Sequence, residues 1–432
     1  SIGDFHCEFL PVTHSTPKGL ISAIRTPQGL ILHSSDFKLD NNPVDGRITD
    51  LDRIAALSKD PGIRLLLCDS TNAELSGSSI SESEVGDGLE EIFMKFQHER
   101  IIATCFSSHI HRIQQIIDIS KEQGRKVATL GFSMERNISL ARSLGVISVS
   151  EDDLVDISEI ETYPKNQICV ISTGSQGEPR SSLNLSAQNS GKWLRIDEND
   201  VIIFSSRTIP GNEKRVARLV NNLVSLGASV VNDENLNTHT SGHGQREELS
   251  ELHQAANPEW FIPVHGELRH LVAHRELAIE IGTNPKNALL ATDGDQVIME
   301  DSGLTLNRKK CQGHYIFSQG SIVETRHDLF KDRNILGKEG CVIARVSISE
   351  KDKTLIGAPS VISKGWLSAD ISERHEQEIE DQLSSELKTF LKNRKELTQE
   401  VLEQKVRRVT GSMVNDSTKR RPMIIPLVDI LP

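Results

Sequence analysis

The sequence predicts an α/β protein of two or three domains, with a doubly wound parallel sheet in its middle region. Three observations predict this fold class. At 432 residues the chain is too long for one ordinary core. Apolar strands alternate with amphipathic helices from about residue 81 to residue 237. Short strands separated by turns come before this region, and strands followed by charged helices come after it.

The first region is predicted to form part of an antiparallel or mixed sheet. Its expected strands are Phe5 to Pro11, Gly19 to Arg25 and Leu30 to Ser34. The segment Thr26 to Gly29 contains Pro and Gly and is typical of a turn, so it joins the last two of these strands.

The middle region carries the pattern of a parallel sheet. A helix is expected around Val216, Leu219, Val220 and Leu223, because these residues are spaced at i, i+3, i+4 and i+7. Strands that alternate with such helices predict a doubly wound sheet. The expected strands are Ile101 to Cys105, Lys126 to Leu130, Gln167 to Ser172, Val201 to Ser205 and Ala228 to Asn232.

The last region divides into two parts. From about Glu247 to Gly282 two helices flank the strand Trp260 to Val264, and short strands follow to about Met299. A third region starts near Cys311 and is predicted to be α+β. Its expected elements are the strands Gly340 to Ser349, Thr354 to Val361 and Pro422 to Leu427, and the helices Ser372 to Arg394 and Gln399 to Val409.

Composition narrows the class of protein. Hydrophobic residues make up 37% and charged residues 25%, which is ordinary for a soluble globular protein. No apolar run reaches the roughly 18 residues that cross a bilayer, so a cytoplasmic protein without membrane contact is expected. The six cysteines are scattered without zinc-ribbon spacing. A formal net charge of -12 argues against a generally basic surface, but it permits RNA in one groove.

Three loop motifs each place a hard metal ligand directly after a strand. They are PVTHS with His14, HSSDFK with Asp36 and FIPVHGE with His265. Imidazole and carboxylate groups at strand ends suit zinc or manganese. A single His or Asp after a strand is more often a satisfied loop residue, so none of these motifs carries a metal site alone.

A second group of motifs offers polar side chains and backbone N–H groups. LLLCDSTNAE places Asp69 at the end of an apolar strand, where an open α/β sheet presents functional groups, although a turn Asp is the plainer interpretation. STGSQGEP and THTSGHG are glycine and hydroxyl loops that could hold a phosphate. The second of these loops contains His239, Thr240, Ser241, Gly242 and His243, just before a helix that begins near Gln245.

The combination of motifs resembles ribonuclease J, an enzyme with a metallo-β-lactamase fold of the β-CASP group. VTHS, SSDFK, DSTNAE, STGSQGEP, IPGNE, SGHG and PVHGE occur in the order and approximate spacing of that family, and RRPMIIP near the C-terminus also matches it. The resemblance implies a metallo-β-lactamase αββα sandwich that is N-terminally incomplete, formed by residues 1–80 and 247–325. It further implies an inserted doubly wound β-CASP domain at 81–246 and a small α+β C-terminal domain at 340–432.

The resemblance also implies residue roles. His14 binds a first metal ion, Asp36 bridges two ions and His265 binds the second. Asp69 and His243 match the first two β-CASP motifs and are the expected catalytic pair, while residues 239 to 243 hold the substrate phosphate. The expected cofactors are two divalent ions, with zinc first and manganese or magnesium as alternatives, and the expected mechanism is two-metal hydrolysis.

Partners follow from the same resemblance. The expected substrate is RNA, preferentially 5′-monophosphorylated, which the family cuts internally and degrades from the 5′ end in rRNA processing and mRNA decay. A homodimer or homotetramer through the C-terminal domain is expected, with a ribonuclease paralogue as a further partner.

The sequence departs from the family at three places. The HxHxDH metal motif is absent; His109 and His111 have the HxH spacing but lie at the start of a helix in the insertion. Ser35 stands where the family usually has Gly, and His109 stands where it usually has Asn. The leading expectation is a truncated, inactive piece of an active ribonuclease. The alternatives are a non-catalytic RNA-binding or assembly subunit, and a related hydrolase that acts on DNA or a small ester.

Overall fold

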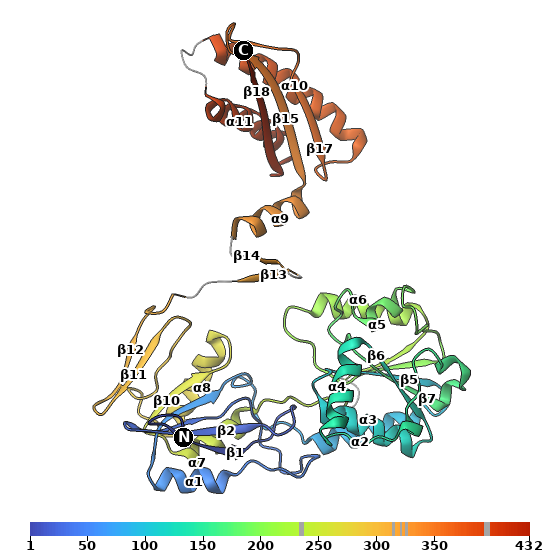
Figure 1. Cartoon of the computed structure of the whole chain (residues 1–432), viewed down its shortest axis with the longest axis vertical. Helices are drawn as coiled ribbons and strands as arrows, with labels where there is room; N and C mark the ends of the chain where they lie inside the picture. Colours follow the sequence, from blue (N-terminus) through green and yellow to red (C-terminus); the bar gives the residue numbers. More distant parts are fainter. Residues whose placement is uncertain (233–236, 313–315, 320–321, 325–326, 393–397) are drawn as a thin grey trace. The chain divides into compact units, whose positions relative to one another are not determined.

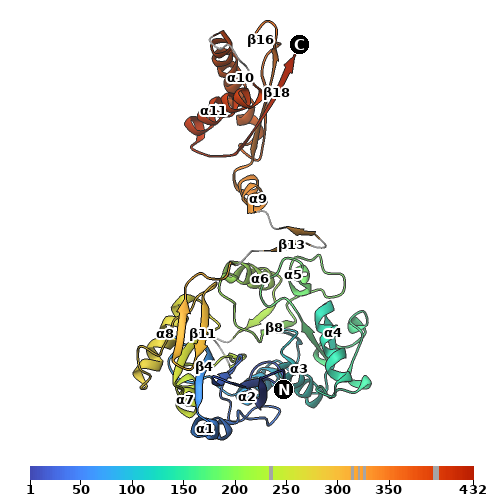
Figure 2. The same cartoon turned by 60° about the vertical axis from the view of Figure 1, so that its left-hand side comes forward.

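The computed structural model describes residues 1–232, 237–312, 316–319, 322–324, 327–392 and 398–432. Figures 1 and 2 show the chain from two directions. It divides into two compact units, Ser1–Gln312 and Gly313–Pro432. None of the helices in these described ranges is both long enough and apolar enough to cross a membrane.

The first sheet of the larger unit is mixed, as the sequence predicts, and has the order β1-β2-β3-β4-β10. Its first three strands pair antiparallel, whereas β3, β4 and β10 run parallel. β10 pairs with β4 although the whole second sheet lies between them in sequence, so the first sheet is interrupted by an insertion. The strands are β1 (His6–Pro11), β2 (Leu20–Thr26), β3 (Gly29–His33), β4 (Ile63–Asp69) and β10 (Trp260–Val264).

Three helices share an apolar core with this sheet. They are α1 (Leu51–Lys59), α7 (Arg246–Ala256) and α8 (Leu268–Glu280). Ile54 of α1, Leu252 of α7 and Ala278 of α8 have no exposed surface and pack with Leu66 of β4 and Phe261 of β10. Because α7 and α8 come after the insertion, this core depends on segments from both ends of the unit. A hairpin of β11 (Gln296–Glu300) and β12 (Gly303–Asn307) follows.

The second sheet is fully parallel and doubly wound, as predicted, with the order β6-β7-β5-β8-β9. Its central strands are buried along their whole length, which explains their continuous apolar sequences. The strands are β5 (Arg100–Thr104), β6 (Lys126–Leu130), β7 (Ile168–Ser172), β8 (Asp200–Phe204) and β9 (Ser229–Val231).

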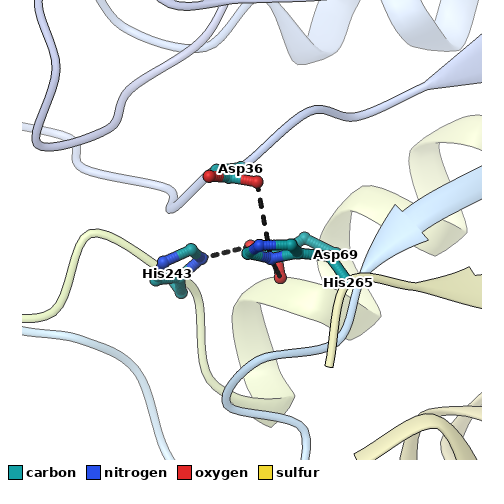
Figure 3. Close-up of side chains that lie close together, drawn as sticks. All are labelled: Asp36, Asp69, His243 and His265. Carbon is teal, nitrogen blue, oxygen red and sulfur yellow. Dashed lines mark hydrogen bonds and ion pairs between the residues drawn. The ribbon is translucent and has the colours of Figure 1, made fainter. Parts of the chain in front are cut away.

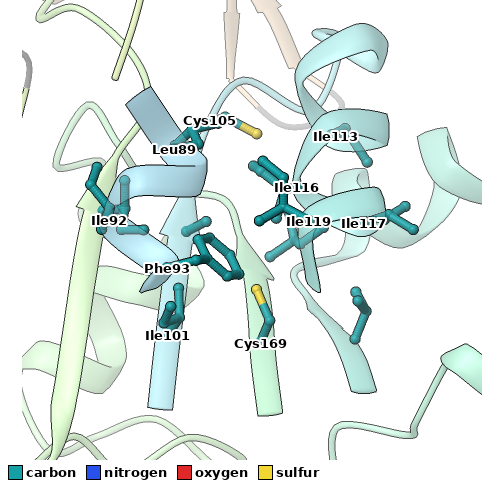
Figure 4. Close-up of a cluster of buried hydrophobic side chains, with 14 of the residues drawn as sticks. Leu89, Ile92, Phe93, Ile101, Cys105, Ile113, Ile116, Ile117, Ile119 and Cys169 are labelled. Atoms are coloured by element: carbon teal, nitrogen blue, oxygen red, sulfur yellow. The ribbon is translucent and has the colours of Figure 1, made fainter. Parts of the chain in front are cut away.

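Helices cover both faces of the second sheet. One face carries α2 (Glu82–Lys95), α3 (Ile110–Glu122) and α4 (Phe132–Ser143), which bury an apolar cluster that includes Phe93 and Ile116 (Figure 4). The opposite face carries α5 (Ser182–Ala187) and α6 (Glu213–Ser225).

The smaller unit is built on β15 (Cys341–Ser349), which pairs with three other strands. One face of this sheet packs on two long helices through a core that includes Trp366 and Leu383. The remaining elements are β16 (Thr354–Leu355), β17 (Ser360–Lys364), β18 (Met423–Leu431), α10 (Ala369–Lys392), α11 (Gln399–Thr418), α9 (His327–Glu339), β13 (Phe317–Gln319) and β14 (Ile322–Glu324).

Several element boundaries in this unit differ from the prediction. The expected strand Thr354 to Val361 is two strands, because Gly357, at φ 77°, and Pro359 interrupt it. The second helix continues past Val409 and ends at Thr418, before the left-handed residue Lys419. The expected end of the first helix at Arg394 and the expected domain end at residue 325 lie outside the described residues.

The core of the second sheet gives a test of the fold. Phe93 of α2 has no exposed surface, whereas Phe132 at the start of α4 is 80% exposed. We expect Phe93→Ala to lower the free energy of unfolding by about 3–5 kcal/mol, because it leaves a cavity in a close-packed core. The same truncation at Phe132 should change it by less than about 0.5 kcal/mol. Urea titration followed by circular dichroism measures both variants, and equal losses would contradict this packing.

Candidate active site

Four loops meet at one edge of the first sheet. β3, β4 and β10 are parallel, so their carboxyl ends lie on the same side, and β1 points the same way because two antiparallel pairings separate it from β3. Asp69 ends β4 and His265 follows β10 directly. His14 and Asp36 each come three residues after their strands. The topology thus brings together the predicted metal ligands, which are far apart in sequence.

The loops that carry two of these side chains have left-handed backbone. Ser35 has a φ of 55° and His265 a φ of 56°, values that few residues other than Gly adopt without cost. The Ser35 hydroxyl donates to the carbonyl of Leu20 at 2.8 Å, which supports the turn. The left-handed φ explains why glycine is the expected residue at this position. With Ser35 there instead, Asp36 still lies between His14 and His265.

Asp36, Asp69, His243 and His265 form a compact group (Figure 3). One potential ligand atom from each lies within 4.8 Å of the others. The Nδ1 atom of His265 is 3.4 Å from Asp36 Oδ1 and 3.2 Å from Asp69 Oδ1. On the other side of Asp36, Oδ2 is 4.0 Å from Nε2 of His14. The two oxygens of the Asp36 carboxylate therefore face different imidazoles.

Asp69 is buried and held by several donors. Its Oδ2 atom accepts from His243 Nδ1 at 2.6 Å, and its Oδ1 atom accepts from the Thr71 hydroxyl at 2.6 Å and the Thr71 N–H at 3.0 Å. Burial raises the pKa of Asp69, but the hydrogen bonds from His243 and Thr71 and the charge of His243 outweigh burial, so the pKa lies well below its usual range. Asp69 is therefore held in its charged, carboxylate form.

Two histidines of the site, His243 and His14, have pKa values shifted in opposite directions. Burial lowers the pKa of His243, but the hydrogen bond to Asp69 and its charge outweigh burial, so the pKa of His243 is raised. Burial lowers the pKa of His14, and this outweighs the hydrogen bond to the Gly242 carbonyl. That bond, at 2.6 Å, uses Nδ1 of His14 as donor and leaves Nε2 to face Asp36 as a ligand atom.

The donor set fits a divalent metal ion. Asp36 is 44% exposed in its side chain, and its oxygens lie between His14 and His265. Proximity alone also groups Asp69 and His243 with these residues. Asp69 accepts hydrogen bonds at both oxygens, from His243 and from Thr71. Imidazole and carboxylate donors are those that zinc and manganese take in proteins.

The loop Ser241 to Gly244 lies against the expected metal ligands His14, Asp36 and His265, which we call the metal-ligand group. A Cβ atom at Gly242 would come within 2.8 Å of His14 Cε1, so only glycine permits this approach. The loop is fixed by Asn72, whose Nδ2 atom donates to Ser241 Oγ and to the His243 carbonyl, both at 2.8 Å. The role of Asn72 was missed in the sequence, although it stands three residues after Asp69 in the same motif.

Other sequence candidates lie elsewhere. His239 is partly buried near Arg112 and His109; burial and the charge of Arg112 lower its pKa to about 3. The Thr240 hydroxyl donates to the carbonyl of Ile80 at 2.8 Å. His109 is buried beside Glu82, at 3.4 Å, and the neighbouring His111 faces Asp45. The HxH pair of the insertion therefore does not join the metal-ligand group in the described part of the chain.

Hydrogen bonds made by Ser70 support the loops that carry Asp69 and His265. The Ser70 N–H donates to the His265 carbonyl at 3.2 Å, which joins the loops after β4 and β10. The Ser70 hydroxyl is 3.0 Å from Nδ1 of His274 in α8. Burial lowers the pKa of His274 to about 3, so this imidazole stays neutral at physiological pH and packs on the ring of Phe261.

The interrupted mixed sheet, its ligands at the carboxyl edge and the inserted doubly wound sheet define a metallo-hydrolase of the metallo-β-lactamase and β-CASP type. Three family descriptions match the chain. They are "Ribonuclease J, beta-CASP domain" at residues 98–223, "Zn-dependent metallo-hydrolase RNA specificity domain" at 231–289 and "Ribonuclease J C-terminal domain" at 329–429.

Curated relatives agree with these matches. Ribonuclease J of Mycolicibacterium smegmatis is 36% identical, over 99% of this chain and 75% of that protein. Ribonuclease J 2 of Staphylococcus aureus is 32% identical, over 97% of this chain and 75% of that protein. The chain belongs to the ribonuclease J family, and the resemblance drawn from its motifs is confirmed.

The ligand assignment predicts the effect of removing one imidazole. We expect His265→Ala to lower the affinity for Zn²⁺ by at least about ten-fold, because a bound ion would keep Asp36 but lose the imidazole ligand beside it. His270→Ala is the matched control, since this histidine follows on α8 and bonds the Glu267 N–H outside the group. Isothermal titration with Zn²⁺ measures both variants. An unchanged affinity in His265→Ala would remove His265 from the ligand set.

Proposed function

We propose that this protein is a metal-dependent ribonuclease whose reaction centre lies between Asp36, His265 and the loop Ser241 to Gly244. The observation that carries the proposal is the Asp36 carboxylate, which presents one oxygen to His14 and the other to His265. A carboxylate placed between two imidazoles in this way can bridge two ions. We therefore propose a two-ion site with zinc as the metal, held by these three side chains together with further donors.

The proposed chemistry divides between the metal and the chain. Divalent ions bound at this site supply Lewis-acid polarisation of a phosphodiester and stabilise its developing negative charge. The chain supplies orientation: His243 donates through Nδ1 to Asp69, so its Nε2 atom can donate to a phosphate oxygen or to the leaving oxygen. The raised pKa of His243 favours the protonated form that such a donor needs. Ser241 and Gly242 belong to the same loop as His243 and would contact the phosphate.

The substrate follows from the family and from the site. We propose RNA as substrate, cut internally and also degraded from a 5′-monophosphate end, in rRNA processing and mRNA decay. An overall formal charge of -12 disfavours general binding of nucleic acid. Recognition would then depend on the polar loops and on the metal ions at the sheet edge, which would contact the phosphates directly.

The smaller unit has a surface suited to self-association. Its sheet buries one face on α10 and α11, and the opposite face exposes Ile362 of β17 at 54% and Leu427 of β18 at 46%. We propose that this face supports a homodimer or homotetramer, because such residues exclude water when they pair.

Removal of the bridging carboxylate tests the proposed function. Asp36→Ala should reduce cleavage of 5′-monophosphorylated RNA by at least about 10³-fold in the presence of Zn²⁺ or Mn²⁺, because both ions lose a shared ligand. The exposed Glu251→Ala on α7 is the control and should cleave like the parent. Products are resolved by gel electrophoresis, with the equivalent DNA in parallel. RNA binding without cleavage in the metal-loaded parent would indicate a non-catalytic subunit instead.

A second variant separates orientation from metal binding. We expect His243→Gln to lower kcat by about 10²–10⁴-fold, as removal of a general acid or base does, while the bound metal content stays unchanged. Steady-state kinetics and elemental analysis of the same sample measure the two quantities. A parallel loss of metal would make His243 a ligand and would overturn its assignment to orientation.

A further inference from the structure

Two connectors join the sheets of the larger unit. The outgoing connector, residues 70–81, leads from β4 into α2, and the returning connector, residues 237–245, leads into α7 and contains the loop Ser241 to Gly244. Any change in how these connectors lie against each other moves that loop relative to Asp36 and His265. The groups that fix the connectors therefore bear on the geometry of the reaction.

Arg112 of α3, in the domain of the second sheet, donates hydrogen bonds to groups at both connectors. It has no exposed surface. Its guanidinium donates through Nε and Nη2 to Glu82 Oε1, at 2.8 and 2.5 Å, directly after the outgoing connector. Through Nη1 it donates to the carbonyl of Thr238 at 2.7 Å, in the returning connector, and to Ser205 Oγ at 2.5 Å. Ser205 in turn donates to the Thr238 carbonyl at 2.7 Å.

The metal-binding sheet holds the same connectors from the other side. Asp40, in the loop after Asp36, accepts from the Glu82 N–H at 2.8 Å and from the Ser81 hydroxyl at 2.8 Å. The Ile80 carbonyl accepts from Lys38 Nζ at 3.0 Å and from the Thr240 hydroxyl at 2.8 Å. A continuous run of hydrogen bonds thus leads from Arg112 through both connectors to the loop that carries Asp36.

The geometry points to Arg112 as a positioning residue for RNA cleavage: by tying Glu82 to the Thr238 carbonyl, it sets the place of the loop Ser241 to Gly244 relative to the metal ligands. Arg112 touches neither the ligands nor that loop, and it acts through the returning connector. The planar guanidinium suits this role because its donors reach Glu82 and Thr238 together, which a lysine ammonium at one point cannot do. The inference rests on the proposed ribonuclease function.

Arg100 provides a matched control within the same domain. It is 1% exposed and donates to Asp200 through Nε at 2.8 Å and to Glu161 through Nη1 at 2.9 Å. It lies at the start of β5, whereas the connectors are held near the opposite ends of the strands. Arg100→Lys should therefore disturb a buried ion pair of the same kind without moving either connector.

The experiment compares Arg112→Lys with Arg100→Lys in the metal-loaded protein. We expect Arg112→Lys to lower kcat per folded molecule by at least about ten-fold, because small displacements of positioned groups are costly, with KM and metal content nearly unchanged. Arg100→Lys should lower the melting temperature by a similar amount and keep kcat. Equal kcat in the two variants would overturn the inference.

Two further measurements keep the outcomes distinct. If Arg112→Lys does not fold, Ser205→Ala decides, because it removes one neutral anchor of the Thr238 carbonyl and leaves the buried charges paired. A fall in kcat of about three-fold supports the positioning role, and an unchanged kcat contradicts it. Absence of RNA cleavage by the metal-loaded parent itself would refute the proposed function, a result separate from any difference between the variants.

Discussion

The site depends first on the hydrogen bond between Asp69 and His243. This bond joins β4 of the first sheet to the loop that follows the inserted domain, and its length of 2.6 Å indicates a strong, charge-assisted contact. Because Asp69 is almost fully buried, its charge needs the donors supplied by His243 and Thr71. Loss of His243 would remove the shortest donor to Asp69 Oδ2 and one of the contacts that hold the loop Ser241 to Gly244 beside Asp36 and His265.

Buried ion pairs lie on both sides of the connectors between the inserted domain and the metal-binding sheet. Arg112 with Glu82 and Lys38 with Asp40 are fully or almost fully buried, and each group finds several partners. Such pairs add little net stability compared with apolar residues, but breaking one is costly. Their hydrogen bonds are directional, so they fix the positions of two connectors that apolar contacts alone would allow to shift. The loop Ser241 to Gly244 belongs to the returning connector and is positioned with it.

The sequence predicts the site where each motif is local. His14, Asp36 and His265 each follow a strand that its apolar residues reveal, and strand ends of a parallel arrangement meet at one edge. The pairing of β10 with β4, across the whole insertion, cannot be read from local pattern, and only the family resemblance implies it. The positions of Asn72 and Arg112 are also hidden, because polar residues in a loop and on a helix carry no periodic signal for the partners they reach. Gly357 and Pro359 are turn signals that the expected strand Thr354 to Val361 overlooked, whereas no such signal marks the extension of α11 to Thr418.

The most direct test of the central claim is anomalous diffraction at the zinc edge from crystals of the protein grown with Zn²⁺. The account predicts a peak bound to an Asp36 oxygen and to a nitrogen of His265 at about 2.0–2.2 Å, with Asp69 still hydrogen-bonded to His243. A peak bound by Asp69 and His243 while Asp36 stays free would contradict it, because the orienting pair would then be the metal ligands.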